Sequence, residues 1–255
     1  MDLQTTLESN LKRLRLPGMA ENLDGRVREA EVGRLGYVDF LSLLLQDEIA
    51  NRDANNFEKR LRDAGFSNDC TFEGFDYSFN ADVLVPATIR DLATCRFIER
   101  KANLILGGPP GIGKSHLAQA IGHEACRRGL DVLFSKTHKL LDVIRDEQRP
   151  RKAQIVLKRA ITVGLLVLDD FAFRRYTQTE AELLYTIADE RLNRRSIIVT
   201  SNRPPEDWFS VFPDPVIGGA ILDRLVSGAL KLIIPKGRSY RKEHVSGPRK
   251  TQPKS

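Results

Sequence analysis

The 255-residue sequence predicts an α/β fold, in which a five-stranded parallel sheet flanked by helices follows a small all-helical N-terminal region. Three observations lead to this prediction. Short apolar runs alternate with helical patterns in the later part of the chain, as expected of parallel strands covered on both faces. A glycine-rich Gly-x4-Gly-Lys-Ser pattern at residues 108–115 stands between one such run and a helical pattern. The first residues carry leucines at helical spacing.

The N-terminal region is expected to contain two helices. Four leucines lie on one face of the first, at spacings of four and three residues: Leu3, Leu7, Leu11 and Leu14. The second helix is expected over residues 39–64, with Asp39 as its N-cap and Gly65 as the glycine that ends it. Residues 66–86 carry several aromatic side chains among Gly and Asp, and an irregular connector is expected there. A domain boundary is therefore predicted near residue 70.

The sheet is predicted from five apolar runs, at residues 102–106, 132–134, 165–168, 197–200 and 230–234. A helix is expected between the third and the fourth of these, over residues 177–193. Thr179 and Glu182 have the spacing of a capping box at its start. The chain after residue 234 is basic and interrupted by Pro and Gly, and we expect it to fray beyond about residue 241.

The glycine-rich pattern is typical of a loop that holds the phosphates of a nucleotide. Its glycines let backbone N–H groups turn toward phosphate oxygens, and the N-terminus of the following helix adds a positive dipole. Lys114 is expected to reach the β- and γ-phosphates, and the Ser115 hydroxyl to ligate Mg²⁺. The predicted binding residues are Gly108, Pro109, Pro110, Gly111, Ile112, Gly113, Lys114, Ser115 and His116. The alternative, a glycine-rich turn without a ligand, does not account for the strand before the loop and the helix after it.

Two later strands end in polar residues that suit the same site. Asp169 and Asp170 follow an apolar run, so a buried strand delivers them to the sheet edge where phosphates bind. Asp169 is expected to hold Mg²⁺, directly or through water, and Asp170 to orient the attacking water. Asn202 follows the next strand and could sense the γ-phosphate, although a turn or cap residue fits that position equally well.

Together these segments resemble the AAA+ ATPases of the IstB type, which help the transposases of bacterial insertion sequences, with DnaC-type helicase loaders as relatives. The matching stretches are residues 107–118, 168–171, 200–208, 220–225 and 239–241. The Ser-Asn-Arg-Pro-Pro-Glu-Asp-Trp and Leu-Asp-Arg-Leu runs are more discriminating than the phosphate loop itself. The resemblance spans nearly all of the chain and leaves out the tail after Lys242.

The resemblance implies roles that spacing alone does not give. Asn202 corresponds to the first sensor, Arg224 to an arginine finger that completes the ATP site of a neighbouring subunit, and Arg241 to a second sensor. A homo-oligomer with ATP sites at subunit interfaces follows, together with an ATPase that binds and bends duplex DNA and recruits a transposase. Asp170 replaces the glutamate typical of most AAA+ proteins, and its carboxylate is one methylene shorter, which leads us to expect slow intrinsic hydrolysis.

Basic residues indicate where DNA could bind. The chain has 40 Lys and Arg against 34 Asp and Glu, which gives a net charge of +6 and suits a polyanionic partner. The predicted phosphate contacts lie between the second and third strands: Arg145, Arg149, Arg151, Lys152, Lys158 and Arg159. Such contacts carry affinity but little sequence information. The alternative is a solvated helix face, because Asp146 and Glu147 stand among these cations.

The resulting organisation has a helical domain over residues 1–70, for binding DNA or a partner or for oligomerisation. An ATP-binding domain covers residues 71–242, and a basic flexible tail covers 243–255. Scattered cysteines, the absence of a long apolar run and a polar start favour a cytoplasmic protein. The main alternative function is a DnaC-like helicase loader. An ATP-binding scaffold that scarcely hydrolyses and a small-molecule kinase are further alternatives.

Overall fold

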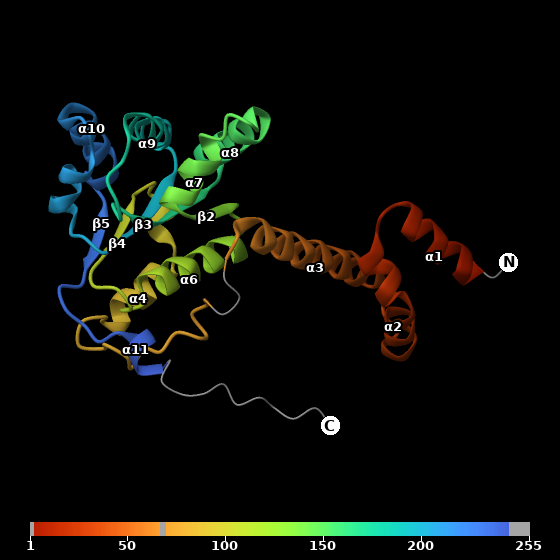
Figure 1. Ribbon diagram of the computed structural model, residues 1–255. Helices are drawn as coiled ribbons and strands as arrows, with labels where there is room; N and C mark the ends of the chain where they lie inside the picture. The colour runs from red at the N-terminus through yellow and green to blue at the C-terminus, as the bar shows by residue number, and fades with distance from the viewer. Residues whose placement is uncertain (1–2, 67–69, 245–255) are drawn as a thin grey trace, which may run out of the picture. The chain divides into compact units, whose positions relative to one another are not determined.

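The computed structural model describes residues 3–66 and 70–244 of the chain (Figure 1). The chain divides into two compact units, Met1–Lys59 and Arg60–Ser255, and the division falls within the long helix α3, Tyr37–Ala64. Across these described ranges, no helix combines the length and the apolar character needed to cross a membrane. The assignment of functions to residues 1–70, 71–242 and 243–255 stays a prediction.

The first unit is helical, with α1 (Leu3–Arg13), α2 (Pro17–Gly33) and the larger part of α3. Leu11, Met19, Leu23 and Leu44 form its small core. Gly18 allows the close approach of two helices, because a Cβ there would lie 2.8 Å from the backbone oxygen of Asp47. The sequence did not separate α2 from the preceding helical pattern.

The predicted second helix differs at its start and agrees at its end. It begins at Tyr37, so Asp39 lies in its first turn and is not the N-cap. The N-cap position is Gly36, so the predicted N-cap is wrong by three residues. The helix ends at Ala64, and Gly65 follows with a φ of +78°, a left-handed conformation that glycine adopts without steric cost.

The second unit contains the predicted five-stranded parallel sheet. Its strands are β1 (Leu104–Gly107), β2 (Val132–Lys136), β3 (Leu165–Phe171), β4 (Ser196–Ser201) and β5 (Leu230–Ile233). They lie in the order β2-β3-β4-β1-β5, and each neighbouring pair is parallel. Parallel strands need crossover connections, and the helices between them supply these.

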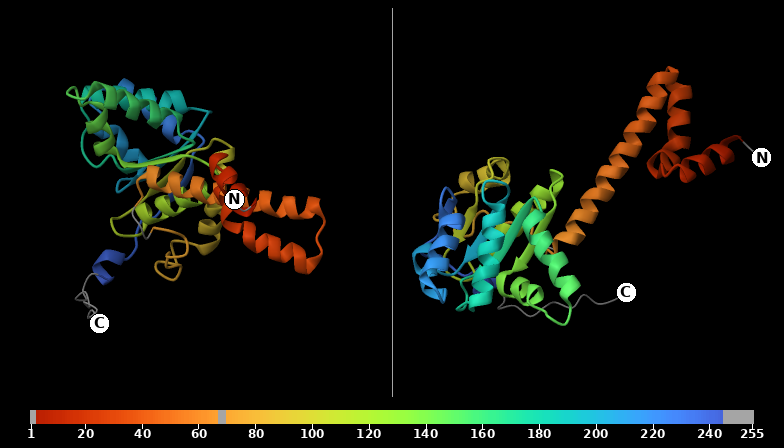
Figure 2. Two further views of the ribbon diagram at one scale, coloured as in Figure 1. Left: turned by 90° about the vertical axis from the view of Figure 1, so that its right-hand side faces the viewer. Right: turned by 90° about the horizontal axis from the view of Figure 1, so that it is seen from above.

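Helices cover both faces of this sheet (Figure 1, Figure 2). One face carries α4 (Pro86–Ala93) and α6 (Lys114–Arg127). The other carries α7 (Thr137–Ile144), α8 (Pro150–Thr162), α9 (Gln178–Arg191) and α10 (Pro215–Val226), whose apolar residues share one core with the inner strands. The shorter helices are α5 (Arg96–Glu99), η1 (Pro205–Val211) and α11 (Tyr240–His244). Continuous apolar strands are thus buried on both sides, as the sequence predicts.

The start of α9 corrects one further expectation. The capping box is formed by Thr177 and Glu180, not by Thr179 and Glu182. The Thr177 side chain accepts a hydrogen bond from the backbone N–H of Glu180 (3.3 Å), and the Glu180 carboxylate accepts one from the Thr177 N–H (2.8 Å). Thr179 has the same spacing to an acid but is already the second residue of the helix, so it does not occupy the N-cap position that a capping box requires.

The parallel arrangement brings three polar chain segments to one edge of the sheet. β1 ends at Gly107, directly before the glycine-rich loop, and its neighbour β4 ends at Ser201, directly before Asn202. On the far side of β4, β3 carries Asp169 and Asp170 near its end. The β3–β4 register shifts between Leu168 and Phe171, and Asp170 adopts a positive φ of 55° there. This irregularity takes Asp170 out of the regular alternation of the strand, whereas Asp169 keeps its register with Lys136 of β2.

Candidate nucleotide-binding site

The backbone of the glycine-rich loop has the form that the sequence predicts. Gly108, Gly111 and Gly113 have φ values of +144°, +86° and +100°, which residues with a Cβ rarely adopt. A Cβ on Gly111 would also collide with the Ser239 side chain. Gly113 is the N-cap of α6, so the N-terminus of this 14-residue helix opens toward the loop. Such a terminus attracts anions.

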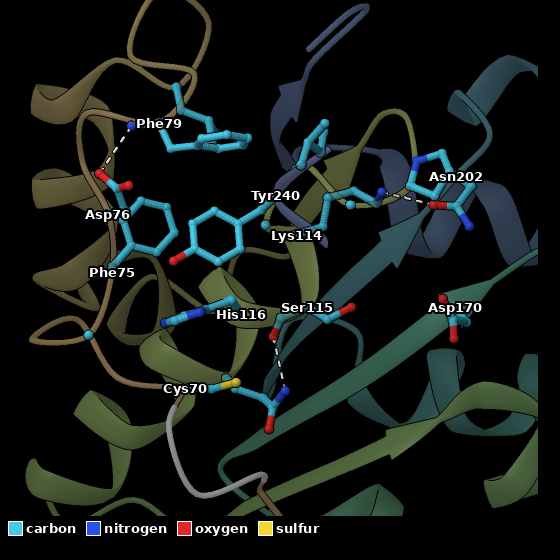
Figure 3. Close-up of a pocket in the computed structure, with 17 residues that line it drawn as sticks. Cys70, Phe75, Asp76, Phe79, Lys114, Ser115, His116, Asp170, Asn202 and Tyr240 are labelled. Carbon is cyan, nitrogen blue, oxygen red and sulfur yellow. Dashed lines mark hydrogen bonds between the residues drawn. The ribbon is translucent and has the colours of Figure 1, made fainter. Parts of the chain in front are cut away.

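Lys114 is held inside the loop. Its side chain is 9% exposed, and Nζ donates to the backbone oxygens of Gly108 and Pro109, both at 2.7 Å. A third hydrogen bond runs from Nζ to Oδ1 of Asn202 at 2.8 Å (Figure 3). These three hydrogen bonds are to neutral oxygens, which an anionic phosphate can supplement or replace. Lys114 and Asn202, 88 positions apart in the sequence, meet at one point.

Asp169 forms the second part of the site. This carboxylate is 3% exposed, and its Oδ1 accepts hydrogen bonds from the hydroxyls of Ser115 (2.7 Å) and Thr200 (2.6 Å). Hydroxyl and carboxylate oxygens are ligands that Mg²⁺ prefers, so the donor set fits that ion. Thr200 is a site residue that the sequence analysis missed. The signal was its position next to the last residue of β4, on a strand that ends beside the phosphate loop.

Asp170 points to a different partner. Its Oδ2 accepts from Nζ of Lys136 at 2.7 Å, and its backbone N–H donates to the Thr200 hydroxyl at 3.1 Å. Lys136 is the last residue of β2, the strand that pairs with β3. The ion pair is partly exposed, with 46% of the Lys136 side chain and 28% of the Asp170 side chain accessible. The carboxylate expected to orient water is therefore tied to a cation in this conformation.

Lys114, Ser115, Asp170 and Asn202 border a cavity of about 370 Å³, a volume typical of small-molecule sites. Of the nine predicted loop residues, seven line it, and Gly108 and Pro109 lie behind the lining with their carbonyls on Lys114. Asp170 and Asn202 line it as well. The rings of Phe75, Phe79 and Tyr240 lie on the side away from Asp170 and Asn202, with Asp76 beside them (Figure 3). One end of the cavity is thus rich in aromatic rings, and the other end carries Asp170 and Asn202.

The aromatic side comes from segments that the sequence analysis described as a connector and a tail. Asn80 exchanges two hydrogen bonds of 2.9 Å with the backbone N–H and C=O of Arg238. The backbone N–H of Tyr240 donates to the Gly111 oxygen at 2.9 Å, within the phosphate loop. The Phe79 and Tyr240 rings meet edge to face, 5.1 Å apart. The aromatic residues between positions 72 and 79 were the available signal for this wall.

The two predicted arginines have different positions. Arg241 belongs to α11, but its side chain lies outside the described part of the chain, so its role stays a prediction. Arg224, near the end of α10, donates from Nε to Asp189 (2.7 Å) and from its terminal nitrogen to the Tyr185 hydroxyl (3.0 Å). Its backbone oxygen accepts from Asn103, directly before β1, whereas the phosphate loop follows β1. Arg224 therefore lies at the opposite edge of the sheet from its own phosphate loop.

The six predicted DNA-contacting residues divide into two groups. Arg145 donates to the buried carboxylate of Glu180 at 2.6 Å, and Arg159 donates to the backbone oxygen of Asp63 at 2.6 Å. The other four are exposed, and their side chains have no hydrogen bond or ion pair within the described residues: Arg149, Arg151, Lys152 and Lys158. They lie on α8 and its N-cap, so the structure leaves a basic surface on this helix.

Fold and pocket together define a phosphate-loop ATP-binding protein of the AAA+ class. A family model described as "IstB-like ATP binding protein" matches residues 9–247, and the chain belongs to this family. It is 39% identical over 236 residues to an ATP-binding protein in an insertion sequence of Mycobacterium tuberculosis, a match covering 92% of this chain and 93% of the relative. The ATP-binding protein of insertion sequence IS21 from Pseudomonas aeruginosa is 34% identical, over 92% of this chain and 88% of that protein.

The fold is shared with proteins of DNA replication. The crystal structure of the DnaC helicase loader superposes with a TM-score of 0.56 and 23% identity, over 65% of this chain and 96% of that chain. At this identity the similarity concerns the fold alone. The resemblance to IstB-type AAA+ proteins and the AAA+ fold predicted from the sequence are both confirmed.

Proposed function

We propose that this protein hydrolyses ATP and acts as a DNA-binding helper of a transposase. In this proposal it assembles on duplex DNA, contributes to target-site selection, and recruits and stimulates the transposase. The observation that carries the ATPase part is that Lys114, Ser115, Asp170 and Asn202 line one cavity, while Asp169 accepts a hydrogen bond from the Ser115 hydroxyl. The transposition part rests on the family and on relatives that are named for insertion sequences.

Each residue at this edge has a proposed role that fits its surroundings. The loop and Lys114 bind the phosphates, while the aromatic side of the cavity suits a nucleobase. Ser115 and Asp169 would hold Mg²⁺, which neutralises phosphate charge when bound. Asp170 orients the attacking water, and Asn202, already hydrogen-bonded to Lys114, lies where a γ-phosphate sensor is needed. The pairing of Asp170 with Lys136 supports slow hydrolysis by the isolated subunit, because it occupies the carboxylate.

Assembly is proposed from the position of Arg224. This arginine lies at the sheet edge that faces away from its own phosphate loop, so it can complete an ATP site only in another subunit. An arginine supplied in this way makes hydrolysis depend on assembly. Arg224→Ala should leave ATP binding largely intact and stop turnover. Mixing it with Asp170→Asn subunits should restore part of the activity, because each variant supplies what the other lacks.

DNA binding is proposed for the basic surface of α8. The four exposed cations of α8 and its N-cap can contact phosphates, whereas Arg145 and Arg159 are engaged with other groups of the protein. Duplex DNA would then be bound largely without regard to sequence, because phosphate contacts carry no base information. The helical domain at residues 1–70 and the basic tail at 243–255 are proposed to contribute further contacts with DNA, with a partner or with other subunits.

The test is to measure duplex-DNA binding and particle size together, with and without ATP and Mg²⁺. ATP-dependent assembly on random-sequence duplex, weakened steeply by salt, is the expected result. A subunit that stays monomeric and is indifferent to duplex DNA would contradict the proposal. The second candidate, a helicase loader, is favoured only by the fold shared with DnaC. That function predicts that the chain retains a replicative helicase in a pull-down, which a transposition helper does not.

A further inference from the structure

A second cavity lies at the other edge of the sheet and has an unusual charge. Its volume is about 160 Å³, and four of its lining residues are cationic: Arg100, Lys101, Arg191 and Arg224. The described residues that line it include no carboxylate. The remaining lining consists of amide, hydroxyl, small and apolar side chains. A concave site with several cations and no lining anion attracts a compact anion.

The floor of this cavity contains a buried arginine without a carboxylate partner. Arg191 is 1% exposed, and its guanidinium donates to the backbone oxygens of Ala160 (2.9 Å), Val163 (2.9 Å) and Ser196 (2.6 Å). Its Nε is buried and has no hydrogen-bond partner among the described residues. Burial, and to a smaller extent the charge of Arg195, lowers the pKa of Arg191 to about 9. A positive charge is therefore built into the wall and is not neutralised there.

The rim carries the two cations that a ligand can reach. Arg100 and Lys101 are exposed, and neither forms an ion pair within the described residues. Lys101 has a positive φ of 58°, so the chain makes a tight turn at the rim. Asn103 fixes the wall behind them, because its side chain donates to the Arg224 and Leu225 oxygens and accepts from the Ile197 N–H.

Two acidic residues of α9 lie outside the lining of the cavity and already form ion pairs with arginines. Asp189 accepts from Nε of Arg224 at 2.7 Å, and Glu190 pairs with Arg194 at 3.1 Å. Asp189 thus offsets part of the charge of Arg224 but leaves Arg100 and Lys101 uncompensated. Asp223 also acts on Arg224 from outside the lining, and the charged side chains of the lining itself are all cationic.

The position of the cavity excludes the chain's own nucleotide as its ligand. Lys101 and Asn103 precede β1, and the phosphate loop follows β1. At about 3.3 Å per residue, the four residues of this strand separate the two edges by more than 10 Å. A phosphate that enters this cavity must therefore come from another molecule.

We propose that this cavity is a phosphate-binding site for the triphosphate held in the phosphate loop of a second copy of the chain. Arg100 and Lys101 act there together with Arg224, and Arg191 supplies a fixed positive background. The proposal rests on the proposed ATPase assembly and extends it, since it assigns two further residues to the subunit interface. A phosphodiester of DNA has the same chemistry, and the experiment separates the two sources.

The test compares two double variants that remove equal charge. Arg100→Gln/Lys101→Asn removes the rim cations, with asparagine chosen because it tolerates a positive φ. The matched control is Arg90→Gln/Arg96→Gln, at exposed positions that do not line the cavity. Thermal melting confirms folding of both. ATP affinity, ATP-dependent particle size, turnover and duplex-DNA affinity are then measured.

The rim variant is expected to bind ATP in its own loop within about twofold of the wild type. Its ATP-dependent assembly and turnover should fall about tenfold or more, as expected for the loss of charged hydrogen bonds. The control variant should match the wild type. Mixing the rim variant with Lys114→Ala subunits should restore part of the turnover, because the first supplies a phosphate loop and the second an intact cavity.

Two results would overturn the proposal. One is a rim variant that assembles and turns over ATP like the control. The other is a loss of DNA affinity with unchanged ATP-dependent assembly, which would identify DNA as the phosphate source. If the wild type itself neither assembles nor hydrolyses ATP, the proposed function fails on its own. The cavity is then tested with tripolyphosphate on Lys114→Ala subunits: binding that the added rim substitutions abolish supports a phosphate site, and absence of binding refutes it.

Discussion

The phosphate-loop edge of the sheet and the exposed face of α8 use polar residues in opposite ways. At the edge, Lys114, Ser115, Asp169 and Asp170 all have hydrogen-bond partners at 2.8 Å or less. On α8 and its N-cap, four basic side chains have no hydrogen bond or ion pair within the described residues. A site for one small ligand needs side chains fixed before it arrives, whereas a surface for a polyanion needs only charge that is free to adapt.

The largest expected effect is at the fixed site. Lys114→Ala removes the ammonium group from the loop and should lower ATP affinity at least about 100-fold, because two or more charged hydrogen bonds are lost. Titration with a fluorescent ATP analogue measures this. Lys139→Ala, at an exposed position on α7, is the matched control. Unchanged ATP affinity in Lys114→Ala would refute the assignment of the site.

The second prediction concerns the exposed cations of α8. Arg151→Ala/Lys152→Ala/Lys158→Ala should weaken duplex-DNA binding about tenfold or more at low salt and leave ATP affinity unchanged. The dependence of log affinity on log salt should become shallower by about 2.7, since three phosphate contacts are lost. Fluorescence anisotropy over a salt series measures both quantities. Arg90→Ala/Arg96→Ala/Lys231→Ala removes equal charge elsewhere, and an equal loss there would show that net charge alone matters.

The sequence predicted the first region much better than the second. Five parallel strands, the loop and the acids at the end of β3 follow from motifs whose residues are close together in the chain. Thr200 and the aromatic side of the cavity were missed because they depend on how distant segments pack. Asn80 and Arg238, which hold two of these segments together, are 158 positions apart.

The basic cluster shows why charge counting is less informative than a motif. Six cations between the second and third strands look equivalent in the sequence, but the structure divides them. Arg145 faces the buried Glu180, and Arg159 reaches the backbone oxygen of Asp63, 96 positions away. Neither partner can be read from local spacing. The correction at the start of α9 has the same origin, because Thr177 and Thr179 both have an acid three residues later.

A third prediction tests the ion pairs that Arg145 and Arg174 form with Glu180. Glu180 is fully buried and accepts from Arg145 and Arg174 and from the Thr177 N–H. Burial alone raises the pKa of this carboxyl, but these hydrogen bonds and charges outweigh it and lower the pKa to about 2. Glu180→Gln should therefore lower the free energy of unfolding at pH 7 by roughly 1–3 kcal/mol, because two arginines lose their partner.

The pH dependence of this effect is the sharper measurement. A carboxyl with a depressed pKa stabilises the fold above its unfolded-state pKa, and this stability is lost as pH falls through the folded-state value. The difference between wild type and Glu180→Gln should thus shrink between about pH 4.5 and pH 2. Urea unfolding at several pH values measures it. Glu182→Gln, on the same helix, is the control, and a difference independent of pH would contradict the assignment.

The smallest expected effect is on the turnover of ATP, after substitution of Lys136. Lys136 ends β2, immediately before α7, and its ammonium group holds Asp170 at the edge of the nucleotide cavity. The pair is partly exposed, so breaking it costs about 1 kcal/mol or less. Lys136→Ala should therefore raise the turnover of ATP without DNA by at most about fivefold, because the Asp170 carboxylate becomes available to water.

The direction of this change in turnover shows whether Lys136 only holds Asp170 or itself acts on the nucleotide. If Lys136 only restrains Asp170, turnover without DNA rises in Lys136→Ala, and stimulation by DNA becomes correspondingly weaker. A fall in turnover would instead mean that the ammonium group itself acts on the nucleotide. Lys139→Ala, one turn further along the same segment, separates either effect from a general loss of charge. The ratio of turnover with and without duplex DNA, measured for all three proteins, decides whether the nucleotide site is fully assembled in the free subunit or is completed when α8 binds DNA.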